Sequence, residues 1–155
     1  MTVLEMKVEA LMKCVDQDKF EKAMAEVGAA HFGTANADKD RLVQHEIHEI
    51  LLQIGVPASL VGYRQMVYGL ELAVKNPDII DAITKEFYPA VSNRFSTTPS
   101  RTERALRHAI EVAWKRGDWN TLQRYFGYSI SPDKGKPTNS EFIARIAHVV
   151  RDRVM

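Results

Sequence analysis

The sequence predicts an all-α fold, and three observations support this prediction. Apolar residues recur at intervals of three and four through most of the chain, which is the period of an amphipathic helix. Two stretches have the spacing of a capping box at a helix start, Ser100 with Glu103 and Thr138 with Glu141. We find neither the alternation of apolar and polar residues that is typical of strands nor an internal repeat.

Residues 1–40 are expected to form a helical arm and a linker, with a main domain at residues 41–155. Stretch 3–27 has helical periodicity and is rich in Ala, Glu and Lys, which favour helix. Stretch 28–40 lacks this period and carries glycines and small polar residues, so we expect a linker there. The apolar positions of the predicted arm helix are Leu4, Val8, Leu11, Met12, Val15, Phe20, Met24 and Val27.

Two helices are predicted at the start of the main domain. The first spans Leu42–Ile54, and Gly55 followed by Pro57 supplies its stop signal. The second runs from about Ser59 to Val74. The apolar positions of the first helix are Ile47, Ile50, Leu51 and Ile54.

A third helix is predicted from Asn76 to Phe95. Asn76 supplies a cap side chain, Pro77 lacks only a donor that is unused at this position, and Asp78 complements the helix dipole. Because proline removes an interior hydrogen bond, the helix should be kinked or restarted at Pro89.

Three further helices complete the predicted domain of six. A short polar turn at residues 96–99 precedes the fourth helix, which extends to about Arg116 and ends at Gly117. A short fifth helix spans Asp118–Phe126, and a loop covers residues 127–137. The last helix starts near Thr138 and has an apolar face of Phe142, Ile143, Ile146, Val149 and Val150.

The bulk composition excludes several classes of protein. With 45% hydrophobic and 26% charged residues, the 155-residue chain is in the ordinary globular range. Its single cysteine, Cys14, cannot form an intramolecular disulfide or a thiolate metal cage, which suits a reducing cytosol. Charged residues at Glu5, Lys7 and Glu9 interrupt any signal-peptide core, and no apolar run approaches a membrane span. We therefore expect a cytoplasmic protein without membrane segments.

Positive charge is concentrated in one window the size of a helix. The 21 basic and 20 acidic residues nearly cancel over the whole chain. Residues 94–116, however, hold six Lys or Arg against two Glu, while residues 1–40 hold five Lys against eight acids. On a helical wheel the fourth helix gathers Thr102, Ala105, Leu106, Ala109, Ile110 and Ala113 on one side. The other side presents Arg101, Arg104, Arg107, His108, Glu111 and Lys115.

A helix with this division of faces, directly after a tight turn, is typical of a recognition helix in the DNA major groove. Arginine can donate two parallel hydrogen bonds to guanine, glutamate can accept from cytosine, and further basic side chains can neutralise phosphates. The competing interpretation is that a basic helical face is simply solvated. The turn sequence and the crowding of arginines at the start of the helix favour DNA binding.

These residues also resemble a known family, the C-terminal DNA-binding domain of stage zero sporulation protein A. The resemblance covers roughly residues 42–150 and rests on long motifs. They are Pro99-Ser-Arg-Thr-Glu-Arg-Ala-Leu-Arg-His-Ala-Ile-Glu-Val-Ala-Trp114, Phe126-Gly-Tyr128 and Lys136-Pro-Thr-Asn-Ser-Glu-Phe-Ile-Ala144. Upstream matches, in the same order as in the family, are His48-Glu-Ile, Ile54-Gly-Val-Pro-Ala58, Gly62-Tyr63, Ile83-Thr-Lys85 and Tyr88-Pro89.

The resemblance implies a six-helix helix-turn-helix effector domain that binds double-stranded promoter elements, usually as homodimers on tandem sites, at the onset of sporulation. We expect neither a cofactor nor a metal. Carried over to matching positions, the base contacts are Arg101, Glu103 and Arg104, and the DNA-backbone contacts are Ser100, Arg107 and His108. Glu103 has a second interpretation, as the third residue of a capping box.

Two departures from the family bear on mechanism. The family's regulators carry a receiver domain with a phosphorylated aspartate, and about 40 residues before the effector domain are too few to form one. Asp16 and Asp18 cannot take that role, so we expect no dimerisation driven by phosphorylation, and activity that is either constitutive or controlled by something else. The segment after the recognition helix, which in the family contacts the polymerase sigma factor, is residues 118–123 here and differs from the usual pattern.

An enzyme is not expected. The stretch His45-Glu-Ile-His-Glu49 resembles a zinc-protease signature, but its histidines are three apart rather than four and no third ligand is evident. Nor does the chain show a glycine-rich phosphate loop or a nucleophile with an obvious base.

A second hypothesis is an interaction protein that pairs with the full-length sporulation regulator, or competes for its sites, and so antagonises it. The N-terminal helix would then be a docking arm. It could equally pack on its own domain, because an isolated amphipathic helix needs a place to bury its apolar face.

Overall fold

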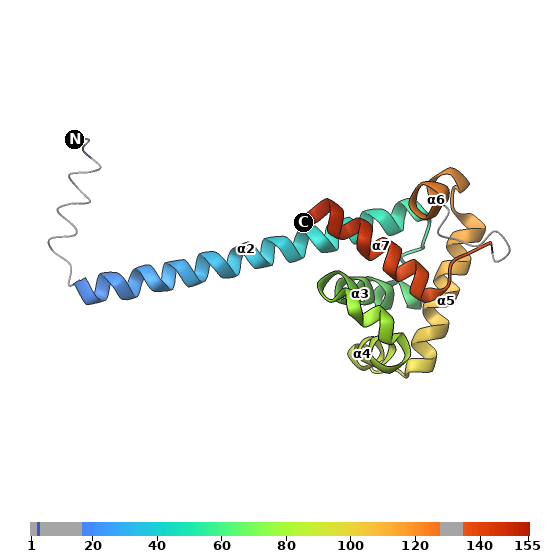
Figure 1. The fold of residues 1–155 in the computed structure, drawn as a ribbon, viewed down its shortest axis with the longest axis horizontal. Helices are drawn as coiled ribbons and strands as arrows, with labels where there is room; N and C mark the ends of the chain where they lie inside the picture. The colour runs from blue at the N-terminus through green and yellow to red at the C-terminus, as the bar shows by residue number, and fades with distance from the viewer. Residues whose placement is uncertain (1–2, 4–16, 128–134) are drawn as a thin grey trace. The chain divides into compact units, whose positions relative to one another are not determined.

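The structure is a computed structural model that describes residue 3, residues 17–127 and residues 135–155, with side chains at residue 3 and from residue 35 onward. Six α-helices, a 3₁₀ helix and a π-helix occupy these ranges, and no strand occurs in them (Figure 1). The predicted all-α fold is therefore confirmed. The chain divides into two compact units, residues 1–40 and 41–155, which we describe separately. No helix in the described ranges is both long and apolar enough to cross a bilayer.

The predicted linker at residues 28–40 is wrong. Helix α2 spans Gln17–Ile54 and runs through this stretch without interruption. Alanines at positions 29, 30, 35 and 37 explain why, because alanine has the highest helix propensity and offsets the cost of Gly28 and Gly33. The predicted arm helix at residues 3–27 is helical from Gln17 onward, and most of its earlier part lies outside the described residues.

Within residues 41–155, the C-terminal part of α2 supplies one wall of the core. Its buried positions follow the predicted helical period and stop at the predicted residue, Gly55. Gly55 has a φ of +96°, a left-handed conformation that glycine adopts without steric cost. Val56 N–H then donates to the Leu51 carbonyl over 3.0 Å, which closes the helix end. The buried side chains of this segment are Val43, Ile47, Ile50, Leu51 and Ile54.

The predicted third helix is divided into three segments. A 3₁₀ helix covers Pro77–Ala82, a π-helix covers Ile83–Phe87, and helix α4 covers Tyr88–Arg94. Pro89 has no N–H and cannot continue the helical hydrogen-bond pattern. In the wider π turn before it, the Tyr88 N–H donates to the carbonyl of Ile83, five residues earlier. The predicted break near Pro89 is thus present, but the predicted Asn76 cap is not, because its side chain makes no capping hydrogen bond.

Helices α5 (Pro99–Arg116), α6 (Trp119–Phe126) and α7 (Asn139–Val154) each begin after a side-chain cap. The predicted capping box at Ser100 is wrong. Thr98 is the N-cap, and its hydroxyl accepts from the Arg101 N–H over 3.2 Å.

The predicted capping pair before α7 is confirmed, and α6 has a cap of its own. Thr138 accepts from the Glu141 N–H over 3.3 Å, while its hydroxyl donates to the Glu141 carboxylate over 3.1 Å. Asp118 caps α6 through the Thr121 N–H, at 3.2 Å.

An aromatic cluster joins α5, α6 and α7. The rings of Phe126 and Phe142 stack with centroids 5.3 Å apart, and Trp114 meets both rings edge-on. This geometry suits the ring quadrupoles and fills the space between the three helices. Helix α7 is also fastened to α3 (Val61–Lys75), because Arg151 donates to the Ala73 carbonyl over 3.0 Å.

Helices α3 and α5 approach each other closely at Gly62. A Cβ atom on Gly62 would lie 2.3 Å from the carbonyl oxygen of Ala105, well inside contact distance. Because the obstacle is backbone, it cannot move aside as a flexible side chain would. We predict that Gly62→Ala lowers the free energy of unfolding by about 1–3 kcal/mol, measured by urea denaturation. An unchanged denaturation midpoint would show that the helices do not pack this closely.

Candidate nucleic-acid interface

Helix α5 has the two faces that the sequence predicts. Its buried face consists of Thr102, Leu106, Ala109, Ile110 and Ala113, and its exposed side chains include Arg101, Arg104, Arg107, His108 and Lys115. Ala105 and Glu111, each half-buried, lie at the boundary. A helix seated by one side in this way leaves its basic side to solvent.

A tight turn separates α4 from α5, as in a helix-turn-helix. Ser96 has a φ of 52°, a left-handed conformation that is uncommon for a residue with a side chain. The Thr97 N–H donates back to the Ser92 carbonyl over 3.0 Å and closes the turn. The chain therefore reverses within residues 95–98 and delivers the start of α5 to the surface.

Arg101 and Arg104 are exposed in the first turns of α5. Neither guanidinium forms an ion pair or a hydrogen bond with another residue in the described ranges. Ser100 and His108, predicted to contact the DNA backbone, are exposed as well. Side chains that are exposed and without partners can donate to bases or phosphates without first breaking an internal contact.

Glu103 and Arg107 form an ion pair one helical turn apart. Their Oε1 and Nη1 atoms are 3.2 Å apart, and the side chains are 32% and 54% exposed respectively. An exposed pair of this kind contributes about 0.3–0.5 kcal/mol, so it can be exchanged for contacts to DNA. The alternative role of Glu103 in a capping box is wrong, because Thr98 caps the helix.

Asn139 connects α7 to α4 and α5. It is buried, and its Nδ2 donates to the Tyr88 hydroxyl and to the Glu103 backbone carbonyl, over 3.0 Å in each case. Burial raises the pKa of Tyr88. Asn139 is not among the site residues predicted from the sequence. The only hint of its role in the sequence is its position directly after the Thr138 cap. No local pattern reveals that its hydrogen-bond partner is 36 residues away.

A cavity of about 480 Å³ lies beside α5, between this helix, the π-helix and the start of α7. Arg107 and Lys136 bring positive charge to it, and Glu103 brings negative charge. Its lining residues are Ile83, Tyr88, Glu103, Arg107, Lys136, Pro137, Thr138, Asn139 and Ser140.

Residues 47–150 match the family model described as Sporulation initiation factor Spo0A C terminal. The chain belongs to this family. The match covers the helix-turn-helix, the Asn139 connection and most of the six-helix domain, and it confirms the resemblance inferred from the motifs. Members of the Spo0A C-terminal family are DNA-binding effector domains of transcription regulation in sporulation, not enzymes.

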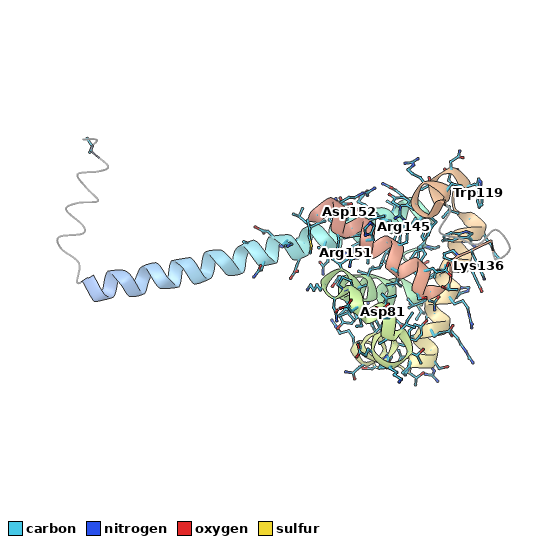
Figure 2. The ribbon with its side chains drawn as sticks, viewed as in Figure 1. Asp81, Trp119, Lys136, Arg145, Arg151 and Asp152 are labelled. Carbon is cyan, nitrogen blue, oxygen red and sulfur yellow. The ribbon has the colours of Figure 1, made fainter. Side chains whose placement is uncertain are left out.

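Beside the recognition helix of this Spo0A C-terminal domain, Lys136 and Glu111 form a second ion pair. Lys136 Nζ donates to Glu111 Oε1 over 2.8 Å (Lys136 is labelled in Figure 2). This hydrogen bond and the positive charge of Lys136 lower the pKa of the Glu111 carboxyl. The pair therefore fastens the segment before α7 to α5.

We predict that Lys136→Met raises the pKa of Glu111 towards its ordinary value, which carboxyl-selective NMR titration measures. A carboxyl whose folded-state pKa is lowered contributes stability above its unfolded pKa and loses it as the pH falls through the folded pKa. The pH dependence of unfolding below about pH 5 should therefore become shallower in the variant. An unchanged Glu111 titration would show that the ion pair does not form in solution.

The histidine pair that resembles a zinc-protease signature is not assembled as a metal site in the described ranges of the Spo0A C-terminal domain. His48 Nδ1 lies 2.7 Å from the Tyr63 hydroxyl, and the rings lie against each other with centroids 5.6 Å apart. No group of three metal-ligating side chains is found in these ranges.

The segment predicted to contact a sigma factor is helix α6 and its cap. Trp119 is 61% exposed on α6 (Figure 2), although large aromatic side chains normally favour burial. In this Spo0A C-terminal domain, therefore, the segment after the recognition helix presents an apolar side chain to solvent.

Proposed function

We propose that residues 1–155 bind promoter DNA in a sequence-specific manner, as a transcription regulator of the sporulation-initiation type that needs no phospho-receiver in this chain. Helix α5 would enter the major groove with its first turns. Because its ligand is promoter DNA, we assign the protein to the cytoplasm.

The observation that supports this proposal most strongly is the state of Arg101 and Arg104. Both guanidinium groups are exposed and have no partner among the described residues, while the opposite face of the same helix is buried. We assign base contacts to Arg101, Glu103 and Arg104, because arginine suits guanine and a carboxylate suits cytosine. We assign backbone contacts to Ser100, Arg107 and His108.

Two protein partners belong to the same proposal. Binding as a homodimer to tandem elements would combine the binding free energies of two recognition helices, so the pair would bind more tightly than either helix alone. A polymerase sigma factor would dock at α6, where Trp119 offers a large exposed side chain.

The proposal is tested with the purified, unphosphorylated chain and two DNA fragments, one with the element recognised by the Spo0A family and one with the same bases shuffled. Fluorescence anisotropy at 150 mM salt should show binding to the first fragment at least about 10³-fold tighter than to the second. Equal affinity for both fragments would contradict sequence-specific recognition.

A parallel measurement separates regulation from antagonism. The same protein is added to the full-length sporulation regulator without DNA, and complex formation is followed by analytical ultracentrifugation. Binding to the regulator together with no binding to either DNA fragment would establish the interaction protein instead. The structure offers no observation that favours this alternative over DNA binding.

A further inference from the structure

The first turn of α3 lies at the edge of the predicted DNA-contacting face. At Gly62 it approaches the backbone of α5 at Ala105 so closely that a side chain there would clash. Arg101 and His108 are four residues before and three residues after Ala105, on the same side of the helix, and both are exposed. The start of α3 is therefore beside side chains to which the proposed function assigns DNA contacts.

This helix start has donors without a side-chain acceptor. Leu60 is the N-cap of α3, and no side chain forms a capping hydrogen bond there. The N–H groups of Val61 and Gly62 have no acceptor within the helix, as in any first helical turn. Together with the positive end of the helix dipole, they favour an anion.

A cavity of about 530 Å³ lies at this helix start, where Leu60 and Val61 contribute to its lining. The first turn of α3 lines it on one side, and Phe95 and Thr97, from the turn before α5, line it on the other. Arg64 is exposed at the cavity, and no acidic residue contributes to its lining. The cavity therefore offers positive charge without a competing carboxylate.

Gln65 is an independent sign that this cavity takes a polar ligand. The residue is only 5% exposed and lines the cavity, and its side-chain oxygen has no hydrogen-bond partner in the described ranges. A buried amide without a partner is costly, which suggests that its partner binds from outside. Rotation about the last bond of the side chain exchanges the oxygen with the NH₂ group, so the same amide can donate to an anion.

We propose that this cavity binds one phosphate group of the DNA backbone. The phosphate oxygens would accept from the N–H groups at the start of α3, from the Gln65 amide and from Arg64. The proposal rests on the proposed function and extends the DNA contact surface from α5 to α3. Because the contact is to phosphate, it strengthens binding to every sequence and fixes the depth of α5 in the groove.

The test compares Arg64→Ala and Gln65→Met with Arg124→Ala, a control that removes one exposed charge from α6. Affinity is measured for the cognate and the shuffled fragment over a range of salt concentrations. Arg64→Ala should weaken binding to both fragments by about tenfold and reduce the salt slope by about 0.9. Gln65→Met should weaken both by about threefold with the slope unchanged, since no charge is lost. Arg124→Ala should change neither affinity nor slope.

Two further measurements identify the phosphate. Cognate fragments with one neutral methylphosphonate at each backbone position in turn should reveal one position that weakens wild-type binding more than it weakens binding of Arg64→Ala. Inorganic phosphate alone, at concentrations up to 1 mM, should leave the amide NMR signals of Val61 and Gly62 in place. The proposal would be overturned if free phosphate shifted these NMR signals to saturation and Arg64→Ala bound DNA as tightly as the wild-type protein. The cavity would then be a site for a free anion.

The failure of this site is distinguishable from failure of the proposed function. Wild-type protein that binds DNA, with Arg64→Ala and Arg124→Ala giving equal affinities, would overturn the phosphate site alone. Wild-type protein that binds neither fragment would overturn both.

Discussion

Replacing Arg101 and Arg104 together by alanine is expected to remove much of the preference for the cognate DNA fragment. Each bidentate arginine contact to a base contributes about 1–3 kcal/mol, so the double variant should bind the cognate fragment ~30-fold to ~10⁴-fold more weakly. Affinity for the shuffled fragment should fall far less, because that binding depends on phosphate contacts. Fluorescence anisotropy with both fragments measures the two changes. Each single variant should relax the preference at its own base pair.

The matched control for this variant is Lys115→Ala with Arg116→Ala. This control also removes two positive charges from α5, but at the end of the helix that is remote from the turn. Both residues are exposed, so the fold should be unaffected. If the control weakens cognate binding as strongly as the variant at Arg101 and Arg104, the basic face acts only through its charge.

Phe142→Ala is expected to cause the largest loss of stability. The side chain is fully buried, stacks on Phe126 and meets Trp114 edge-on, so its removal leaves a cavity at the meeting point of three helices. The free energy of unfolding should fall by about 3–5 kcal/mol. Since native domains are stable by only about 5–15 kcal/mol, this is a large part of the total. Urea denaturation followed by circular dichroism measures the change.

Phe142→Leu serves as the control, because leucine fills part of the same space. It should cost less than half of what the alanine variant costs. A loss below about 1 kcal/mol for Phe142→Ala would mean that α7 is not seated in the core, and the position of Asn139 against α5 would then be in doubt as well.

Much of the fold follows from local patterns in the sequence. Most buried positions of α5 and α7 were predicted from periods of three and four, because each helix packs a single face on the core. Ala147 was not predicted, and the predicted positions Ala105 and Val149 are only half-buried. The helix ends at Gly55 and Gly117 were also predicted, because glycine is a common stop signal for a helix. The structure adds a second reason for glycine at both positions, which is close contact with backbone atoms. A Cβ atom on Gly117 would lie 2.4 Å from the Ile54 carbonyl oxygen.

The errors occur where one local pattern fits two structures. Glycine and small polar residues at 28–40 resemble a loop, yet the alanines among them continue α2. Ser100 and Glu103 have the spacing of a capping box. The helix starts two residues earlier, however, because Thr98 occupies the extended cap position and Pro99 the first helical one. Segment 83–87 adopts a π turn that no sequence period indicates.

The exposed side chains of the candidate site could be predicted from the sequence, but the buried residues that hold them in place could not. The basic side of α5 is visible in the sequence because Arg101, Arg104 and His108 share one side of a helical wheel. Asn139 and the cavity that Gln65 lines depend on contacts between residues far apart in the sequence, which a single chain without aligned relatives does not reveal.

The double hydrogen bond of Asn139 bears on how this domain can be engineered. Its amide joins the backbone of α5 to α7, and α7 lies outside the helix-turn-helix. Transplanting residues 77–116 alone onto a foreign scaffold would leave the carbonyl of Glu103 and the hydroxyl of Tyr88 without their donor. A chimaera that keeps the original target preference would therefore have to include the C-terminal helix together with the grafted motif.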